Sequence, residues 1–243
     1  MLRTAPKKVD ATGDFDVNAG FCVEIAGIDL FIHNTGVAYL AEEEALIVAD
    51  LHLEKGSSYA AKQIFLPPYD TTATLNNLSI AINALEPRKV IALGDSFHDE
   101  DGPNRLNDAD RSHLNALVHS ADWVWISGNH DPILPETLGG TFTDEITLCG
   151  LTLRHDPQVD GTAEIAGHLH PSAKVRGRGR SVRKRCFIAN SERMIMPAFG
   201  RFTGGLNVTD EAFDDFFPAK DYHAYMMGDD RLYPIAAKSC LAG

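Results

Sequence analysis

The chain has 243 residues, 44% of them hydrophobic, and its 22 Lys and Arg against 34 Asp and Glu give a formal net charge of -12 at pH 7. The apolar content suffices for one sizeable core and excludes long intrinsic disorder. The acidic balance excludes a protein that coats nucleic acid by bulk electrostatics. No apolar run reaches about 18 residues and the polar start lacks a signal-peptide core, so we expect neither a membrane span nor secretion. A reducing cytoplasm fits the cysteines, which are scattered without a CxxC pair: Cys22, Cys149, Cys186 and Cys240.

The chain divides into a short arm and one predicted domain. Residues 1–20 mix charges with Thr, Gly and Pro without a steady apolar period, so we predict a poorly ordered N-terminal arm. Residues 21–243 are predicted to form a single domain. This domain opens with three or four short strands up to residue 50, separated by turns at Ala26-Gly27 and Asn34-Thr35-Gly36.

Helices then alternate with strands. One helix is predicted to begin near residues 55–58, and a second follows Pro67-Pro68, where Asp70 or Thr71 can cap it. The strand KVIALGD, a helix near residues 107–119 and the strand DWVWISGNHD come next. The rest of the chain is rich in short strands. Alternation followed by a strand-rich half predicts a mixed fold, α+β or α/β, with a central pair of sheets and helices outside.

Five apolar runs share one feature, because each stops at Asp, Asn or His. These polar residues are Asp50, His52, Asp95, Asn129, His130, Asp131, His155, His168 and His170. Ligands of α/β sheets bind beyond the carboxyl ends of the strands, so we expect these side chains to converge on one crevice. In extended segments residues i and i+2 point to the same side, which would pair Asp50 with His52 and His168 with His170. Mixed oxygen and imidazole donors favour divalent transition metals over calcium.

These motifs resemble, in order, the five motifs of the calcineurin-like metallophosphoesterases: DLH, GD, GNHD, a single His and GHLH. The segments VADLHLEKGSS, FLPPYDT, ALGDSFHD, GNHDP, LRHDP, EIAGHLHP and PAFGRFTGGLNV are similar to one bacterial branch, the ligase-associated DNA-damage-response endonucleases. The similarity extends from about Phe21 to Pro234. It implies a four-layer αββα sandwich, an activity in DNA repair, and functional association with an ATP-dependent DNA ligase.

The resemblance also implies the role of each site residue. One metal would be held by Asp50, His52 and His170, and a second by Asn129, His155 and His168, with Asp95 bridging the two. His130 would contact the scissile phosphate, and Asp131 would orient His130. Two divalent ions can hold a shared hydroxide as the nucleophile. Manganese is the first expectation, with iron and zinc as alternatives.

Substrate contacts are sought outside the metal motifs. His98 follows Asp95 in GDSFHD and is a candidate for the same crevice. The segment KVRGRGRSVRKR carries basic and no acidic residues and begins soon after His170, so we predict a hairpin in which Arg176, Arg178 and Arg180 line one face and guide a nucleic-acid strand.

The sequence therefore predicts a binuclear metal-dependent phosphodiesterase, with an endonuclease acting on DNA as the leading form. Two alternatives stay open. One is a hydrolase of small phosphate esters such as nucleotides, because the ligand set does not separate substrates. The other is a non-catalytic, metal-stabilised module of a repair assembly. The sequence does not give the oligomeric state.

Overall fold

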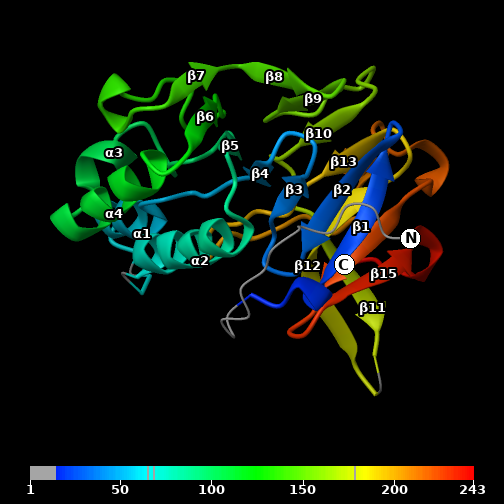
Figure 1. Cartoon of the computed structure of the whole chain (residues 1–243). Coiled ribbons are helices and arrows are strands. Elements are labelled where there is room, and N and C mark those ends of the chain that lie inside the picture. The colour runs from blue at the N-terminus through cyan, green and yellow to red at the C-terminus, as the bar shows by residue number, and fades with distance from the viewer. Residues whose placement is uncertain (1–14, 65, 68, 178) are drawn as a thin grey trace.

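Two β-sheets form the centre of the molecule, and α-helices cover the outer face of the first sheet (Figure 1). The computed structural model describes residues 15–64, 66–67, 69–177 and 179–243. In this part of the chain, no helix is both long and apolar enough to cross a membrane.

The first sheet has seven strands in the order β1-β2-β3-β4-β5-β6-β7. Their bounds are Gly20–Ile25 (β1), Ile28–His33 (β2), Ala38–Leu40 (β3), Ala45–Val48 (β4), Lys89–Leu93 (β5), Asp122–Ile126 (β6) and Thr141–Thr143 (β7). Neighbours are antiparallel from β1 to β4 and parallel from β4 to β7. The carboxyl ends of β4, β5 and β6 therefore meet at one edge of the sheet.

The second sheet has eight strands, ordered β15-β14-β12-β13-β10-β9-β8, with β11 paired to β12. Their bounds are Glu145–Leu148 (β8), Leu151–Arg154 (β9), Glu164–Ala166 (β10), Ser172–Arg176 (β11), Ser181–Ala189 (β12), Arg193–Ile195 (β13), His223–Met227 (β14) and Leu232–Ala236 (β15). Strand β10 runs parallel to both β9 and β13. The segments that follow β9 and β10 carry the remaining metal-motif histidines.

Three apolar clusters hold these layers together. The first lies between the first sheet and the helices Asp70–Leu85 (α2) and Asp108–Val118 (α4), and includes Trp123 and Trp125. The short helix Lys55–Ala61 (α1) contacts α2 and the helix Gly102–Arg105 (α3). The second cluster fills the space between the sheets. The third covers the outer face of the second sheet, where Phe213 and Phe217 are buried. The predicted αββα sandwich is confirmed, and in the described residues 3-10 helices at Glu211–Phe213 and Pro218–Lys220 cover this last face.

The predicted cap of α2 is wrong. Tyr69 occupies the N-cap position and makes no side-chain capping bond. Asp70 instead accepts a hydrogen bond from the Gly56 amide (2.8 Å), and Thr71 bonds both the amide (2.8 Å) and the carboxylate (2.9 Å) of Glu54. Both side chains are buried between helices, so they join α2 to the start of α1, next to the metal motifs.

The chain enters the fold before Phe21. Phe15 is buried and its ring stacks on His33, with the ring centroids 3.8 Å apart. Asp16 caps the 3-10 helix Val17–Ala19 by accepting from the Asn18 amide (2.9 Å). A single buried aromatic residue and a single helix cap produce no periodic pattern of apolar residues, so the sequence did not predict that this segment is folded. Of the predicted arm, residues 15–20 belong to the fold, and residues 1–14 lie outside the described residues.

Candidate metal centre

The polar residues predicted to converge do so at the strand ends. Asp50 follows β4, Asp95 follows β5, and His155 follows β9 in the opposite sheet. All three side chains are buried, with Asp50 fully inaccessible to solvent. The ligand candidates therefore gather where the parallel strands of both sheets end, and each sheet contributes some of them.

Two groups of donors can each hold a cation, and Asp95 belongs to both. Asp50, His52, Asp95 and His170 form one group, and Asp95, His155 and His168 form the other, with the donor atoms of each group within 4.8 Å of one another. His170 Nε2 lies 3.3 Å from Asp50 Oδ1, and His52 Nε2 lies 3.3 Å from His170 Nε2. Converging lone pairs of this kind repel each other unless a cation or a proton lies between them.

Asn129 joins the second group through its side-chain oxygen, which lies 3.0 Å from His155 Nε2. His168 Nδ1 is 3.2 Å from the same nitrogen. On the other side of its ring, His155 Nδ1 donates to the Leu93 carbonyl (2.9 Å). A carbonyl only accepts, so the proton of neutral His155 stays on Nδ1 and the Nε2 lone pair faces the group, as metal-ligating histidines require.

Left-handed backbone conformations place many of these ligand candidates. The residues with φ between 42° and 69° include Asp50, His52, Asp95, His168 and His170. Non-glycine residues adopt this region rarely, and it clusters at functional sites. We expected Asp50 to pair with His52, and His168 with His170, because each pair would lie in an extended segment. That reason is wrong, since residues 50–52 and 168–170 lie outside the strands. Each ligand is aimed by a local turn after its strand.

Gly128 of the GNHD motif lies where two backbone segments come close together. A Cβ atom built on Gly128 would overlap the Asp95 amide and lie 2.6 Å from Asp131 Oδ1. The glycine therefore allows the loop after β6 to pack directly on the loop after β5. This contact also lets the His130 amide donate to Asp95 Oδ1 (2.9 Å), which fixes that carboxylate.

The donor set fits divalent transition metals. It combines the anionic side chains of Asp50 and Asp95 with four imidazoles and one amide oxygen, a mixture suited to such ions. Burial lowers the pKa of His52 to about 2 and, with the charge of His155, also lowers the pKa of His168. Both shifts favour the neutral imidazole of His52 and His168, which is the form that binds a metal.

His130 faces the centre from its rim, and its orienting partner differs from the prediction. Its Nδ1 donates to the His98 carbonyl (2.8 Å), and its Nε2 points toward Asp95 Oδ2 at 4.0 Å. Asp131 instead accepts from the Phe97 amide (2.9 Å). Burial raises the pKa of Asp131 to about 7. Asp131 thus ties the loop after β6 to the loop after β5, while a backbone carbonyl orients His130.

His98 lies in the same crevice, as expected. Its Nδ1 is 3.4 Å from His52 Nδ1, and its ring stacks on that of His130 at 5.1 Å. Burial and the nearby charge of Lys55 lower the pKa of His98 to about 4. Lys55 and Tyr59, on α1, were missed by sequence analysis, although Lys55 lies only three residues after His52. The Tyr59 ring is 5.5 Å from that of His98.

The predicted basic hairpin exists, but its arginine row does not. Strand β11 ends at Arg176, and the turn that follows is closed by the Gly177 amide donating to the Arg180 carbonyl (2.8 Å). Arg178 lies outside the described residues. Because the chain reverses here, Arg176 and Arg180 cannot alternate along one extended strand.

A different set of cations shares one face of this hairpin. The antiparallel register pairs Lys174 with Arg183 and Ser172 with Arg185, and paired residues lie on the same face. We call Lys174, Arg176, Arg183 and Arg185 the basic face. Arg185 donates to the Gly200 carbonyl (2.8 Å), and the Gly200 amide donates to the Asp50 carbonyl (3.1 Å). The basic face thus begins close to Asp50, on the hairpin of β11 and β12 that projects from the rest of the fold (Figure 1).

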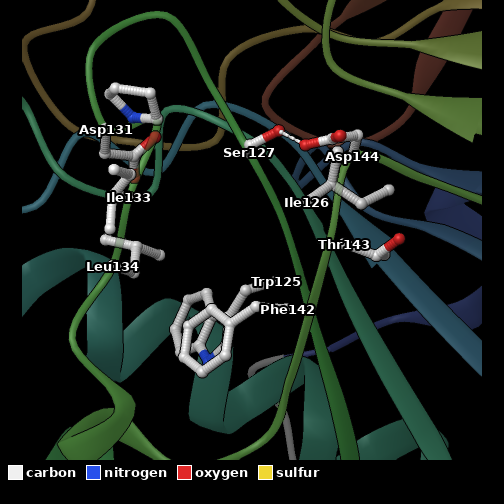
Figure 2. A pocket seen from close by; sticks show the side chains of 10 residues that line it. Trp125, Ile126, Ser127, Asp131, Ile133, Leu134, Phe142, Thr143 and Asp144 are labelled. Carbon is white, nitrogen blue, oxygen red and sulfur yellow. Dashed lines mark hydrogen bonds between the residues drawn. The ribbon is translucent and has the colours of Figure 1, made fainter.

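A separate pocket of about 360 Å³ lies at the ends of β6 and β7. Figure 2 shows Trp125 and Phe142 on one side of it and the segment Asp131–Leu134 on another. The hydrogen bond from Ser127 Oγ to the Asp144 carboxylate (2.8 Å) lies at its edge. None of the candidate metal ligands lines it.

Comparisons with known proteins identify relatives by structure. No protein-family model and no curated protein matches the chain. Among solved structures, the nuclease MPE of Pseudomonas putida has a TM-score of 0.68 and 30% sequence identity, and the match covers 89% of this chain and all of that chain. YfcE, a phosphoesterase from E. coli, matches with a TM-score of 0.38 and 18% identity over 79% of this chain and 98% of that chain.

Proposed function

Since the chain belongs to the metallophosphoesterase family, and is therefore a metal-dependent phosphoesterase, we propose that it cleaves internal phosphodiester bonds of nucleic acid. The observation that carries this proposal is the pair of buried donor groups that share Asp95. The relative that matches over its whole length is a nuclease, which supports a polynucleotide substrate. The motifs similar to the ligase-associated branch support a place in DNA repair, in the cytoplasm and alongside an ATP-dependent ligase.

We assign the ligands by group. Asp50, His52 and His170 would hold one ion, and Asn129, His155 and His168 the other, with Asp95 between them. Two divalent ions in such a site activate water and neutralise charge on the attacked phosphoryl group. Manganese is our first assignment, with iron and zinc as alternatives. Two carboxylates against two dications leave a net positive centre even with a hydroxide included, about +1, which attracts a phosphodiester into an acidic protein.

His130 would act on the leaving oxygen. The His98 carbonyl keeps a proton on Nδ1 (2.8 Å), so Nε2 is the nitrogen that exchanges a proton with substrate. Its ring is 39% exposed, hence open to a bound phosphodiester. When His130 carries a proton on both nitrogens, it can deliver the Nε2 proton to the alkoxide that departs as the phosphodiester bond breaks, and it keeps the Nδ1 proton on the His98 carbonyl.

The basic face would hold the polyanion. Among described residues, the side chains of Lys174 and Arg176 make no hydrogen bond or ion pair with the protein. Arg183 donates to Ser172 Oγ (2.8 Å) and so keeps its strand position. Cations fixed on one face of a hairpin that begins beside the metal centre suit successive phosphates of one strand.

The test follows nicking of circular single-stranded DNA by manganese-loaded protein, with a small chromogenic phosphodiester in parallel and His130→Ala as the contamination control. We expect the circles to open and the variant to be inactive on them. Cleavage of the small diester alone would contradict the nuclease and favour a hydrolase of small phosphate esters. Stoichiometric metal without turnover on either substrate would favour the non-catalytic module.

The hairpin offers a matched pair of variants. The double variant Lys174→Met and Arg176→Met should weaken cleavage of DNA, and more so at low salt, while sparing the small diester. Lys184→Met is the control, because Lys184 lies on the opposite face and pairs with Asp229 (2.9 Å). Equal losses in both variants would contradict a role for the basic face.

A further inference from the structure

Lys55 is a half-buried cation that forms no ion pair with the other described residues. Among the described residues, no carboxylate oxygen lies within 4.0 Å of its ammonium group, and the contact shown is with the Tyr59 ring, at 5.9 Å from the centroid. Burial and the charge of Arg185 lower the pKa of Lys55, and the charge of Asp70 opposes this more weakly. A half-buried ammonium without a carboxylate in contact is costly, which points to an anion that arrives with the substrate.

Tyr59 and His98 add donors to the same place. The Tyr59 hydroxyl has no partner among the described residues, and its ring is 5.5 Å from that of His98. His52 directs Nε2 toward the metal centre, so its Nδ1 proton is shared with His98 Nδ1 at 3.4 Å. Neutral His98 then carries its own proton on Nε2. An ammonium, a hydroxyl and an imidazole N–H are therefore carried by neighbouring side chains.

The same side chains could be considered for a third cation, because His52, His98 and His130 bring ring nitrogens within 4.8 Å. The charge of Lys55 opposes this, since it acts on both His52 and His98. A ligand that is itself anionic is attracted by the ammonium and accepts from all three donors. The oxygens of a phosphate group meet this requirement.

We propose that Lys55, Tyr59 and His98 form a subsite for the non-scissile phosphate that neighbours the scissile one in a polynucleotide. The inference rests on the proposed function, because only a substrate with more than one phosphate fills both places. His98 contacts His52 and His130, so the subsite adjoins the metal centre. A small diester reaches the metals and leaves Lys55 without an anion. The subsite thus favours polynucleotides over small phosphate esters.

The experiment compares Lys55→Met and Tyr59→Phe with the wild type and with Lys89→Met. Lys89 begins β5, whose other end leads to Asp95, so it controls for the loss of one lysine. Cleavage is measured on single-stranded oligothymidylate and on a small chromogenic phosphodiester, with metal content determined for each protein. We expect Lys55→Met to lower kcat/KM on the oligonucleotide about tenfold or more, and Tyr59→Phe by less, with the small diester and the metal content unchanged.

Binding of a labelled oligothymidylate to metal-free protein at several salt concentrations gives an independent readout. Loss of one phosphate contact should make the slope of log affinity against log salt less negative by about 0.7. Equal losses of Lys55→Met on both cleavage substrates, or an unchanged salt slope, would overturn the subsite. Failure of the proposed function is distinguishable, since the wild type itself would then cleave only the small diester.

Discussion

Replacing His130 by Ala should separate proton transfer from metal binding. The His130 side chain lies at 4.0 Å from Asp95 Oδ2 and is 39% exposed, so it sits at the rim of the centre. The interaction that fixes Asp95 comes from the His130 main-chain amide (2.9 Å), which the substitution leaves in place. Both donor groups should therefore survive, and metal content should equal that of the wild type.

The expected loss depends on the leaving group. A positioned general acid contributes roughly 10²- to 10⁴-fold, and this is needed for a nucleoside alkoxide but much less for a nitrophenolate that departs without a proton. His130→Ala should thus lower DNA cleavage by about that factor and chromogenic diester cleavage by much less. His130→Asn is the matched control, because its amide can still donate to the His98 carbonyl while lacking Nε2.

The assay is kcat on both substrates, with metal content measured on the same preparations. If His130→Ala lost equal factors on both substrates, the side chain would be acting on phosphate binding and not on the leaving oxygen. Loss of metal would refute the argument that the main-chain amide alone supports Asp95. Full activity in His130→Asn would show that the hydrogen bond to the His98 carbonyl, and not the Nε2 proton, is what matters.

Three further outcomes are expected. Asp95→Asn should weaken binding of metal in both groups, since Asp95 belongs to both; titration calorimetry showing one ion bound at wild-type affinity would contradict the shared role. Gly128→Ala should lower both the melting temperature and metal content, because the added Cβ would overlap the Asp95 amide; a wild-type melting curve would argue otherwise. Burial lowers the pKa of His33 in the folded state. As the pH drops below about 6.5, His33 is protonated in the unfolded state before it is protonated in the folded state, so the free energy of unfolding should fall. His33→Gln should show a shallower fall in denaturant unfolding against pH, and an identical slope would refute this assignment.

The location of the centre was predictable because it depends on topology alone. Apolar runs that stop at Asp, Asn or His mark strand ends, and parallel strands bring those ends together. Asp50, Asp95 and His155 are buried at these positions. The local geometry was not predictable, because left-handed turns at single residues such as His168 leave no periodic signal. Sequence analysis therefore predicted residues that do converge, but for a partly wrong reason.

Contacts between distant segments account for the other differences. Asp131 was expected to hold its sequence neighbour His130, yet the Phe97 amide is its partner, and only the fold brings these loops together. Lys55 belongs to no sequence pattern, and its interest comes from the fold, which gives it no ion pair among the described residues. The predicted row of Arg176, Arg178 and Arg180 assumed one extended strand. Because the chain turns after Arg176, the residues that share a face with Arg176 are Lys174, Arg183 and Arg185.

The cations form one strip instead of separate patches. Arg185, at the inner end of the basic face, is close enough to Lys55 for its charge to affect that ammonium, and Arg201 acts on Arg185 in turn. The strip thus runs from the hairpin past Asp50, to which Arg185 is linked through Gly200, and on to His98. The rest of the chain carries a net negative charge and repels a polyanion elsewhere. We therefore expect a nucleic-acid strand bound along these cations to pass the metal centre, whereas a single phosphate ester would touch only one point of the strip.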